Sequence, residues 1–152
     1  MIGTDVALAG CALALTVVAG LVVHEWAHAV VLRLARIDHT ISYFPGRTDG
    51  VVGLLASCPW AAVEPHPAGH EPPVFLRAAA LAPVILAVPV FAVGASGVIT
   101  AESPIVTAIA IGWLACSIPS PQDFSVVFYA HRILEEELPS EPNTAVAASR
   151  AD

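Results

Sequence analysis

Three long apolar stretches separated by short polar segments dominate the hydropathy pattern of this chain. They run from about Thr4 to Leu34, from Val74 to about Thr100, and from Ile105 to about Leu134. About 20 residues of α-helix are enough to cross the hydrocarbon core of a bilayer. The pattern therefore predicts three membrane-spanning helices, and Thr4 is the expected N-cap of the first.

The segment between the first two spans has a different pattern. Residues Ile41 to Val63 contain short apolar runs on both sides of the turn dipeptide Asp49-Gly50, which predicts a β-hairpin. The run Val51 to Ala56 is too short to span a membrane, so the hairpin is expected to be re-entrant or interfacial. The predicted fold class is an all-α membrane protein with about three transmembrane helices and a short membrane-associated β-hairpin after the first.

Prolines interrupt the second and third spans. Pro83 and Pro89 are expected to kink the second, and the segment Pro119-Ser-Pro-Gln-Asp-Phe breaks the third. Membrane helices tolerate such breaks where neighbouring groups satisfy the freed backbone carbonyls, or where the break lines a water-filled cavity.

Composition supports lipid as the main environment. Only 12% of the residues are charged, whereas a soluble domain carries about 25%. Residues 1–23 contain no Lys or Arg, so they lack the basic region of a signal peptide and are read as part of a retained span. Basic residues are not clustered, which argues against nucleic acid as a partner. We expect one membrane core, residues 1–134, and an acidic disordered tail, residues 135–152.

The arginines orient the chain in the membrane. Arg33 and Arg36 follow the first span, Arg77 opens the second and Arg132 ends the third. Because positively charged residues favour the cytoplasmic side, the N-terminus is expected outside and the C-terminus in the cytoplasm. The chain is thus predicted to be a multi-pass integral protein of the cell membrane.

The first span contains an HExxH motif, His24-Glu25-Trp26-Ala27-His28. Positions i and i+4 share one helix face, so both imidazoles can reach one ion. Zn²⁺ accepts histidine nitrogen and lowers the pKa of a bound water to about 7, and Glu25 can take a proton from that water. Glu25 lies about 100° from His24 around the helix, so it is not expected to be a ligand. The alternative is a pair of histidines that hydrogen-bond to neighbouring helices.

A catalytic zinc site needs a third protein ligand. Asp123 is the best candidate, because it lies at the break of the third span at a depth similar to that of the histidines. The alternative is that Asp123 only N-caps the helix that follows. His66 and His70 also have i, i+4 spacing, but the Pro and Gly between them argue against a helix, so they are expected to be loop histidines.

An HExxH motif in a first helix and an Asp near a proline-containing break of a later helix resemble the site-2 protease class of intramembrane metalloproteases. The resemblance covers about residues 5 to 134. It implies that His24, His28 and Asp123 bind zinc and that Glu25 is the general base. It also implies an endopeptidase whose substrates are membrane proteins or peptides within the lipid bilayer. Ser120-Pro-Gln precedes Asp123, and Phe124 follows where the family often has Gly, so the chain is expected to be a divergent, minimal member.

Two other functions compete with proteolysis. A non-catalytic zinc-binding membrane protein, such as a scaffold or metal sensor, would also use the histidines. The intact Glu25 argues against it, because a purely structural site needs no base. A transporter subunit with a metal site at the bilayer midplane is the other, and the lack of an evident internal repeat argues against that.

Overall fold

The computed structural model describes residues 2–43, 61–97, 99 and 103–137. The elements, in order, are α1 (Ile2–Leu34), β1 (Asp38–Tyr43), β2 (Ala61–His66), α3 (Pro73–Leu81), η1 (Ala82–Leu86), α4 (Ala87–Ala95), α5 (Pro104–Cys116) and α6 (Pro121–Glu137). Three helical stretches, Gly3–Leu34, Pro73–Ala95 and Pro104–Glu136, are long and apolar enough to cross a membrane. The predicted fold class, helical with a two-stranded antiparallel sheet after the first helix, is confirmed.

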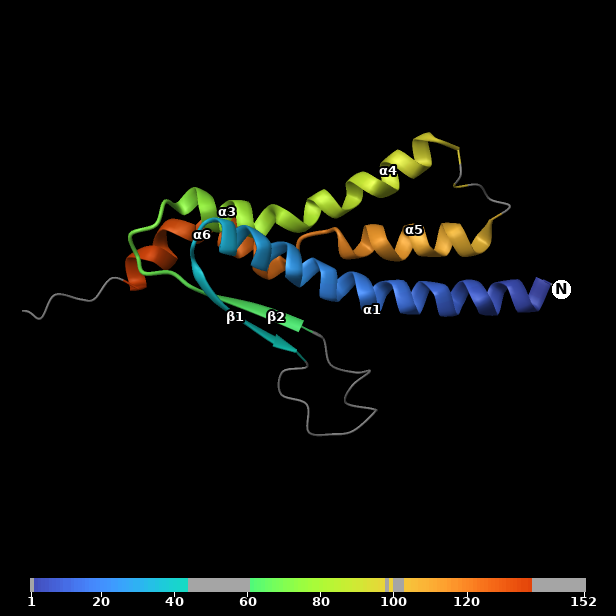
Figure 1. The fold of residues 1–152 in the computed structure, drawn as a ribbon, viewed down its shortest axis with the longest axis horizontal. Helices are drawn as coiled ribbons and strands as arrows, with labels where there is room; N and C mark the ends of the chain where they lie inside the picture. The colour runs from blue at the N-terminus through green and yellow to red at the C-terminus, as the bar shows by residue number, and fades with distance from the viewer. Residues whose placement is uncertain (1, 44–60, 98, 100–102, 138–152) are drawn as a thin grey trace, which may run out of the picture.

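The helices form an elongated bundle (Figure 1). α1 and α5 run in the same direction side by side, and α3, η1 and α4 return in the opposite direction. α6 packs against α3 beside the C-terminal part of α1, and the hairpin projects from that same end. The hairpin, α3 and the α5–α6 break therefore all meet the part of α1 that carries the HExxH motif.

Close approach of α1 and α5 depends on two glycines. A Cβ added to Gly20 would lie 2.8 Å from Sγ of Cys116, and one added to Gly112 would lie 3.3 Å from the carbonyl oxygen of Leu13. Small residues at such positions let membrane helices pack backbone to backbone. His24, one turn beyond Gly20, is thereby brought to the end of α5.

The start of α1 differs from the prediction, whereas its end at Leu34 agrees with it. The helix begins at Ile2, so Thr4 lies inside it and the prediction that Thr4 is the N-cap is wrong. At the other end the N–H of Ile37 donates to the carbonyl of Leu32 at 2.9 Å, and the N–H of Arg36 donates to Arg33 at 3.1 Å. This is a Schellman motif, and Arg36 occupies its left-handed position with φ 59°.

The Schellman turn anchors the hairpin end of the bundle. Ile37 and Leu32 are each only 2% exposed, which is the hydrophobic contact that accompanies this motif. They belong to a core cluster shared by α1, α3 and α6, whose other buried members are Leu76, Ala79, Ala130 and Leu134. The chain leaves this core directly into β1.

The hairpin extends beyond both of its predicted bounds, because β1 begins before Ile41 and β2 continues past Val63. β1 and β2 pair antiparallel, from Asp38 opposite His66 to Tyr43 opposite Ala61. The predicted turn at Asp49-Gly50 and the run Val51 to Ala56 lie outside the described residues. The indole N–H of Trp26 donates to the hydroxyl of Tyr43 at 2.8 Å, which ties β1 to α1.

The breaks of the second and third spans lie at Pro83 and beside Pro119, as predicted, whereas Pro89 lies inside α4 without a break. A 3₁₀ segment, η1, separates α3 from α4 and includes Pro83, while residues 117–120 separate α5 from α6. α6 continues to Glu137, so the first three residues of the predicted tail are helical. The rest of the predicted tail lies outside the described residues.

Candidate metal centre

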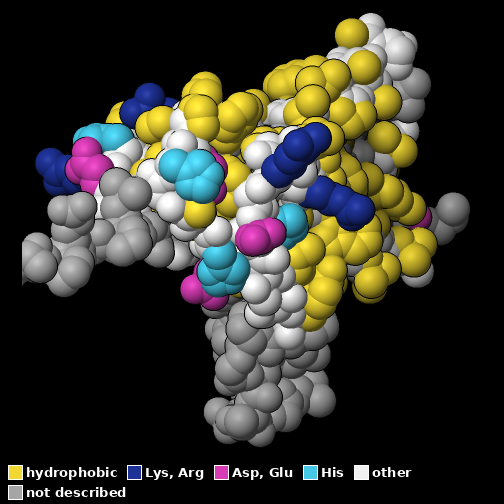
Figure 2. All heavy atoms as spheres, turned by 60° about the vertical axis from the view of Figure 1, so that its left-hand side comes forward, with side chains coloured by type: hydrophobic (Ala, Val, Ile, Leu, Met, Phe, Trp, Pro, Cys, Tyr) yellow, Lys and Arg dark blue, Asp and Glu magenta, His cyan; other side chains and the backbone are white. Residues whose placement is uncertain are grey.

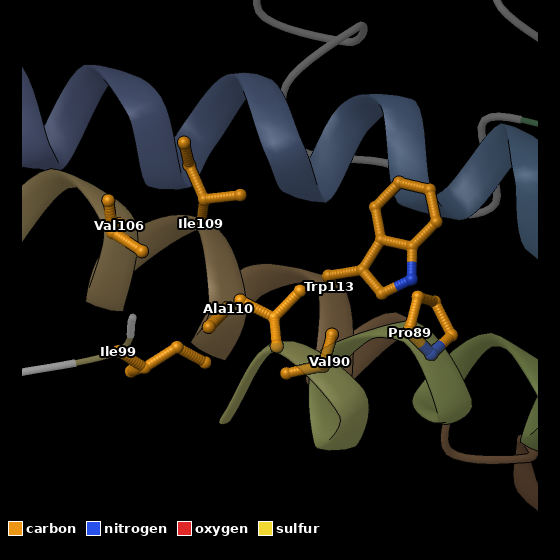
Figure 3. A pocket seen from close by; sticks show the side chains of 8 residues that line it. Pro89, Val90, Ile99, Val106, Ile109, Ala110 and Trp113 are labelled. Carbon is orange, nitrogen blue, oxygen red and sulfur yellow. The ribbon is translucent and has the colours of Figure 1, made fainter. Parts of the chain in front are cut away.

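Two cavities among the described residues differ in the chemistry of the side chains that line them. The first, about 250 Å³, lies between α4 and α5 (Figure 3). Its walls are apolar, and its one polar atom, the indole nitrogen of Trp113, already donates to the carbonyl of Leu86 at 2.8 Å. The second, about 660 Å³, lies where α1, β2, α3 and the α5–α6 break meet, and His24, Glu25, His28 and Asp123 all line it.

The structure brings His24, His28 and Asp123 together. One potential ligand atom from each lies within 4.8 Å of the others. Nε2 of His24 is 3.5 Å from Oδ2 of Asp123, and Nε2 of His28 is 3.2 Å from Oδ1. The histidines are only 6% and 7% exposed. Two helices far apart in the sequence, α1 and α6, thus place three potential metal ligands at one point.

Backbone carbonyls fix the orientation of both imidazoles. Nδ1 of His24 lies 2.7 Å from the carbonyl oxygen of Cys116, and Nδ1 of His28 lies 2.7 Å from that of Ala79. A carbonyl oxygen can only accept, so each Nδ1 must carry the hydrogen. In the neutral ring the lone pair is then on Nε2, the atom that faces Asp123.

The helix breaks supply these two carbonyls. In a regular α-helix the N–H of residue 83 would donate to Ala79, but Pro83 has no N–H. Ala82 donates to Ala79 in a tighter turn instead, and the second lone pair of that oxygen accepts from His28. Cys116 is the last residue of α5, so its carbonyl has no partner within the helix and accepts from His24. The freed carbonyls are thus satisfied by neighbouring side chains.

Asp123 is held by the start of α6. The N–H of Ser120 donates to Oδ2 of Asp123 at 2.6 Å, and the N–H of Asp123 donates to Oγ of Ser120 at 3.1 Å. Because α6 begins at Pro121, Ser120 is the N-cap and Asp123 is the third helical residue, as in a capping box. The alternative that Asp123 is itself the N-cap is therefore wrong. Its carboxylate serves the cap and faces both histidines.

The three converging side chains suit a cation. Two Nε2 lone pairs and a carboxylate are all acceptors, and acceptors that converge without a hydrogen between them repel one another unless a ring is protonated or a cation lies among them. Two imidazoles and one carboxylate are also a known set of three protein ligands at catalytic zinc sites. The group could therefore hold a metal ion, and its residues fit one chemically.

Glu25 lies beside this group without belonging to it. Its side chain lines the same cavity, but it is not among the converging atoms. Its Oε2 accepts a hydrogen bond from the backbone N–H of Val63 in β2, at 3.1 Å. The helix wheel likewise places Glu25 about 100° away from His24. The β2 contact was not expected, because a backbone amide carries no residue-type signal.

Among the described residues, His66 and His70 belong to no group of three or more ligand-type side chains. His66 is the last residue of β2 rather than a loop residue, so that expectation is wrong for His66, whereas His70 lies in the loop before α3. Nε2 of His66 and Oγ1 of Thr40 on β1 lie 3.0 Å apart. Within the described ranges, His24, His28 and Asp123 form the one group of three or more ligand-type side chains.

The backbone acceptors of this site carry a partial sequence signal. Pro83 comes four residues after Ala79. A proline at that spacing leaves the carbonyl of the earlier residue without its usual helical N–H donor. Ser120-x-x-Asp123 has the spacing of a capping box. The geometry of the described residues alone defines the site, since neither a protein-family model nor a characterised protein nor a solved structure matches this chain.

Proposed function

We propose that this protein is a zinc-dependent intramembrane endopeptidase of the site-2 protease kind, which hydrolyses peptide bonds of membrane proteins. One observation carries the proposal. The Nε2 atoms of two oriented imidazoles and the carboxylate of Asp123 converge in a cavity within membrane-spanning helices, with the carboxylate of Glu25 beside them. Ionisable groups at such depth are costly to insert and mark functional sites.

Zinc is the proposed metal because of the ligand types. Imidazole nitrogen suits Zn²⁺, and three protein ligands leave a coordination position for the reaction. When bound, zinc would act as a Lewis acid that lowers the pKa of a coordinated water to about 7 and polarises the scissile carbonyl.

The residues of the chain have three separate roles: metal binding, orientation of the imidazole rings and proton transfer. His24, His28 and Asp123 bind the ion, and the carbonyls of Cys116 and Ala79 hold the rings in the tautomer that binds. Glu25 accepts a proton from the attacking water at a carboxylate oxygen and delivers it to the leaving amide nitrogen. Because Glu25 is adjacent to His24 but on another helix face, it reaches the reacting atoms without taking a ligand position.

The substrate class follows from the cavity and its place in the membrane. The cavity lies between the hairpin strand β2 and the HExxH face of α1. A peptide bond inside an intact helix has its amide groups engaged in the helix, so an unwound segment of a membrane protein is the substrate that the site would accept. The lipid bilayer surrounds both partners.

The proposed orientation places this site towards the cytoplasm. Arg33, Arg36, Arg77 and Arg132 are all at the hairpin end of the three spans. Figure 2 shows charged and histidine side chains at this end and hydrophobic side chains over the helices behind it. Basic residues favour the cytoplasmic side. A reporter fused at the C-terminus should therefore register the cytoplasm, and an external signal would contradict this orientation.

Metal analysis joined to a cleavage assay tests the proposed function. Detergent-purified protein should contain about one zinc per chain. It should cut a single-span polypeptide that carries a fluorophore and a quencher on opposite sides of the span. Folded protein without zinc would refute the enzymatic function. Bound zinc without any cleavage would favour the non-catalytic zinc-binding alternative.

A further inference from the structure

The edge of β2 that points away from β1 faces the proposed base, Glu25. In an antiparallel pair, alternate residues turn their N–H and C=O groups towards the partner strand or away from it. The N–H of Val63 donates to Glu25 on α1, so Val63 belongs to the outward set. Pro65, two residues on, belongs to the same set, and proline is tolerated there because the missing N–H would face away from β1. The amide that this edge offers to the carboxylate of Glu25 is therefore that of Val63.

This amide constrains a side chain that would otherwise rotate. Glu25 has three side-chain torsions, and among the described residues the Val63 N–H is the one hydrogen-bond donor to its carboxylate. A fixed donor on Oε2 selects one rotamer and leaves Oε1 to exchange a proton. Groups that act in catalysis need such support, because small misplacement lowers the rate strongly.

We infer that the backbone amide of Val63 is a positioning group for the general base Glu25, which makes the hairpin part of the active centre. This inference rests on the proposed function. Val63 would act through Glu25 and would touch neither the ion nor the scissile bond. The effect should therefore appear in the chemical step and not in metal binding.

Replacing the amide tests this directly. Val63→Pro removes the N–H at an outward strand position, where Pro65 shows that the edge accepts proline. With the same quenched single-span polypeptide, we expect the zinc content of the parent, a KM close to that of the parent and a kcat at least about tenfold lower, since a general base typically contributes about 10²–10⁴-fold. The matched variant Val63→Ala keeps the backbone N–H, so its kcat should stay close to that of the parent. A kcat of Val63→Pro equal to that of the parent would overturn the inference, and so would loss of zinc, which would mean that the amide maintains the whole site.

A second measurement does not depend on cleavage or on the folding of the proline variant. In ¹⁵N-labelled protein, Glu25→Ala should make the Val63 amide exchange with deuterium faster than in the parent. The Glu64 amide, which faces β1 opposite Thr40, serves as the internal control and should not change. Unchanged exchange at Val63 would refute the contact. A parent without zinc or cleavage would instead refute the proposed function, so the two failures are distinguishable.

Discussion

Nδ1 of His28 donates a hydrogen bond to the carbonyl oxygen of Ala79, 2.7 Å away on another membrane-spanning helix. That oxygen is available because the residue four positions later is Pro83, which has no N–H to donate. Hydrogen bonds of this kind orient a metal-binding histidine and set its tautomer. The 3₁₀ segment at Pro83 is thus part of the candidate metal centre.

The first prediction concerns this 3₁₀ segment. Pro83→Ala introduces an N–H that can donate to Ala79 in a regular helical turn and compete with His28. We expect zinc affinity to fall by about tenfold or more, the usual effect of losing such an outer hydrogen bond, measured by competition with a chelator. Pro89→Ala is the matched control, because an N–H at position 89 would reach the carbonyl of Ile85, and Pro89 lines the apolar cavity, away from the metal-ligating group. Equal affinities in the two variants would contradict the role of Pro83.

The second prediction concerns the packing of α1 on α5. Gly20→Ala would place a Cβ 2.8 Å from Sγ and 2.9 Å from Cβ of Cys116, so the helices must separate. Overpacking of this kind costs about 1–3 kcal/mol, and it should also weaken zinc binding because Cys116 orients His24. Thermal unfolding in detergent and zinc titration measure the two effects. A Cβ at Gly10 meets no atom within 4 Å, so Gly10→Ala should show neither effect.

The third prediction concerns the end of α1. Arg36 has φ 59°, a left-handed conformation that costs a residue with a side chain about 1–2 kcal/mol. Arg36→Gly should therefore raise the unfolding temperature. Arg33→Gly removes the same charge from the last turn of the helix, where glycine costs about 1 kcal/mol, and should lower it. Shifts of the same sign in both variants would mean that charge, and not backbone strain, dominates.

The sequence predicted the side chains of the site better than its backbone. His24 and His28 share a face because of their spacing, and Asp123 is conspicuous as an acid within an apolar span, so residue type and depth were sufficient to connect them. The bond from Val63 to Glu25 could not be predicted, since any residue but proline carries the same amide. The left-handed conformation of Arg36 could not be predicted for a related reason. Glycine normally marks this position of a Schellman motif, whereas here the burial of Ile37 against Leu32 holds Arg36 in that conformation.

The capping box shows how one pattern can support two interpretations. From the sequence, Asp123 was a candidate ligand and a candidate N-cap, and one residue could have had both roles. In the structure Ser120 takes the N-cap position, and Asp123 donates its own N–H to Ser120 while its carboxylate accepts from the Ser120 N–H. The cap therefore fixes the carboxylate that faces the histidines, although Ser120 and not Asp123 is the N-cap.

The last prediction separates metal binding from catalysis. Glu25→Gln keeps the shape of the side chain and removes the base, so it should retain zinc and lose about 10²–10⁴-fold in cleavage rate. Asp123→Ala should instead lose zinc, because two protein ligands remain where catalytic sites use three. Asp123→Ala also breaks the capping box. Ser120→Ala breaks the same capping box but keeps the Asp123 carboxylate, and it should lower the stability of the protein by about 1 kcal/mol. Ser120→Ala should therefore bind zinc more tightly than Asp123→Ala at similar helix stability. If Glu25→Gln cleaved the single-span polypeptide at the parent rate, Glu25 could not be the base, whatever its zinc content.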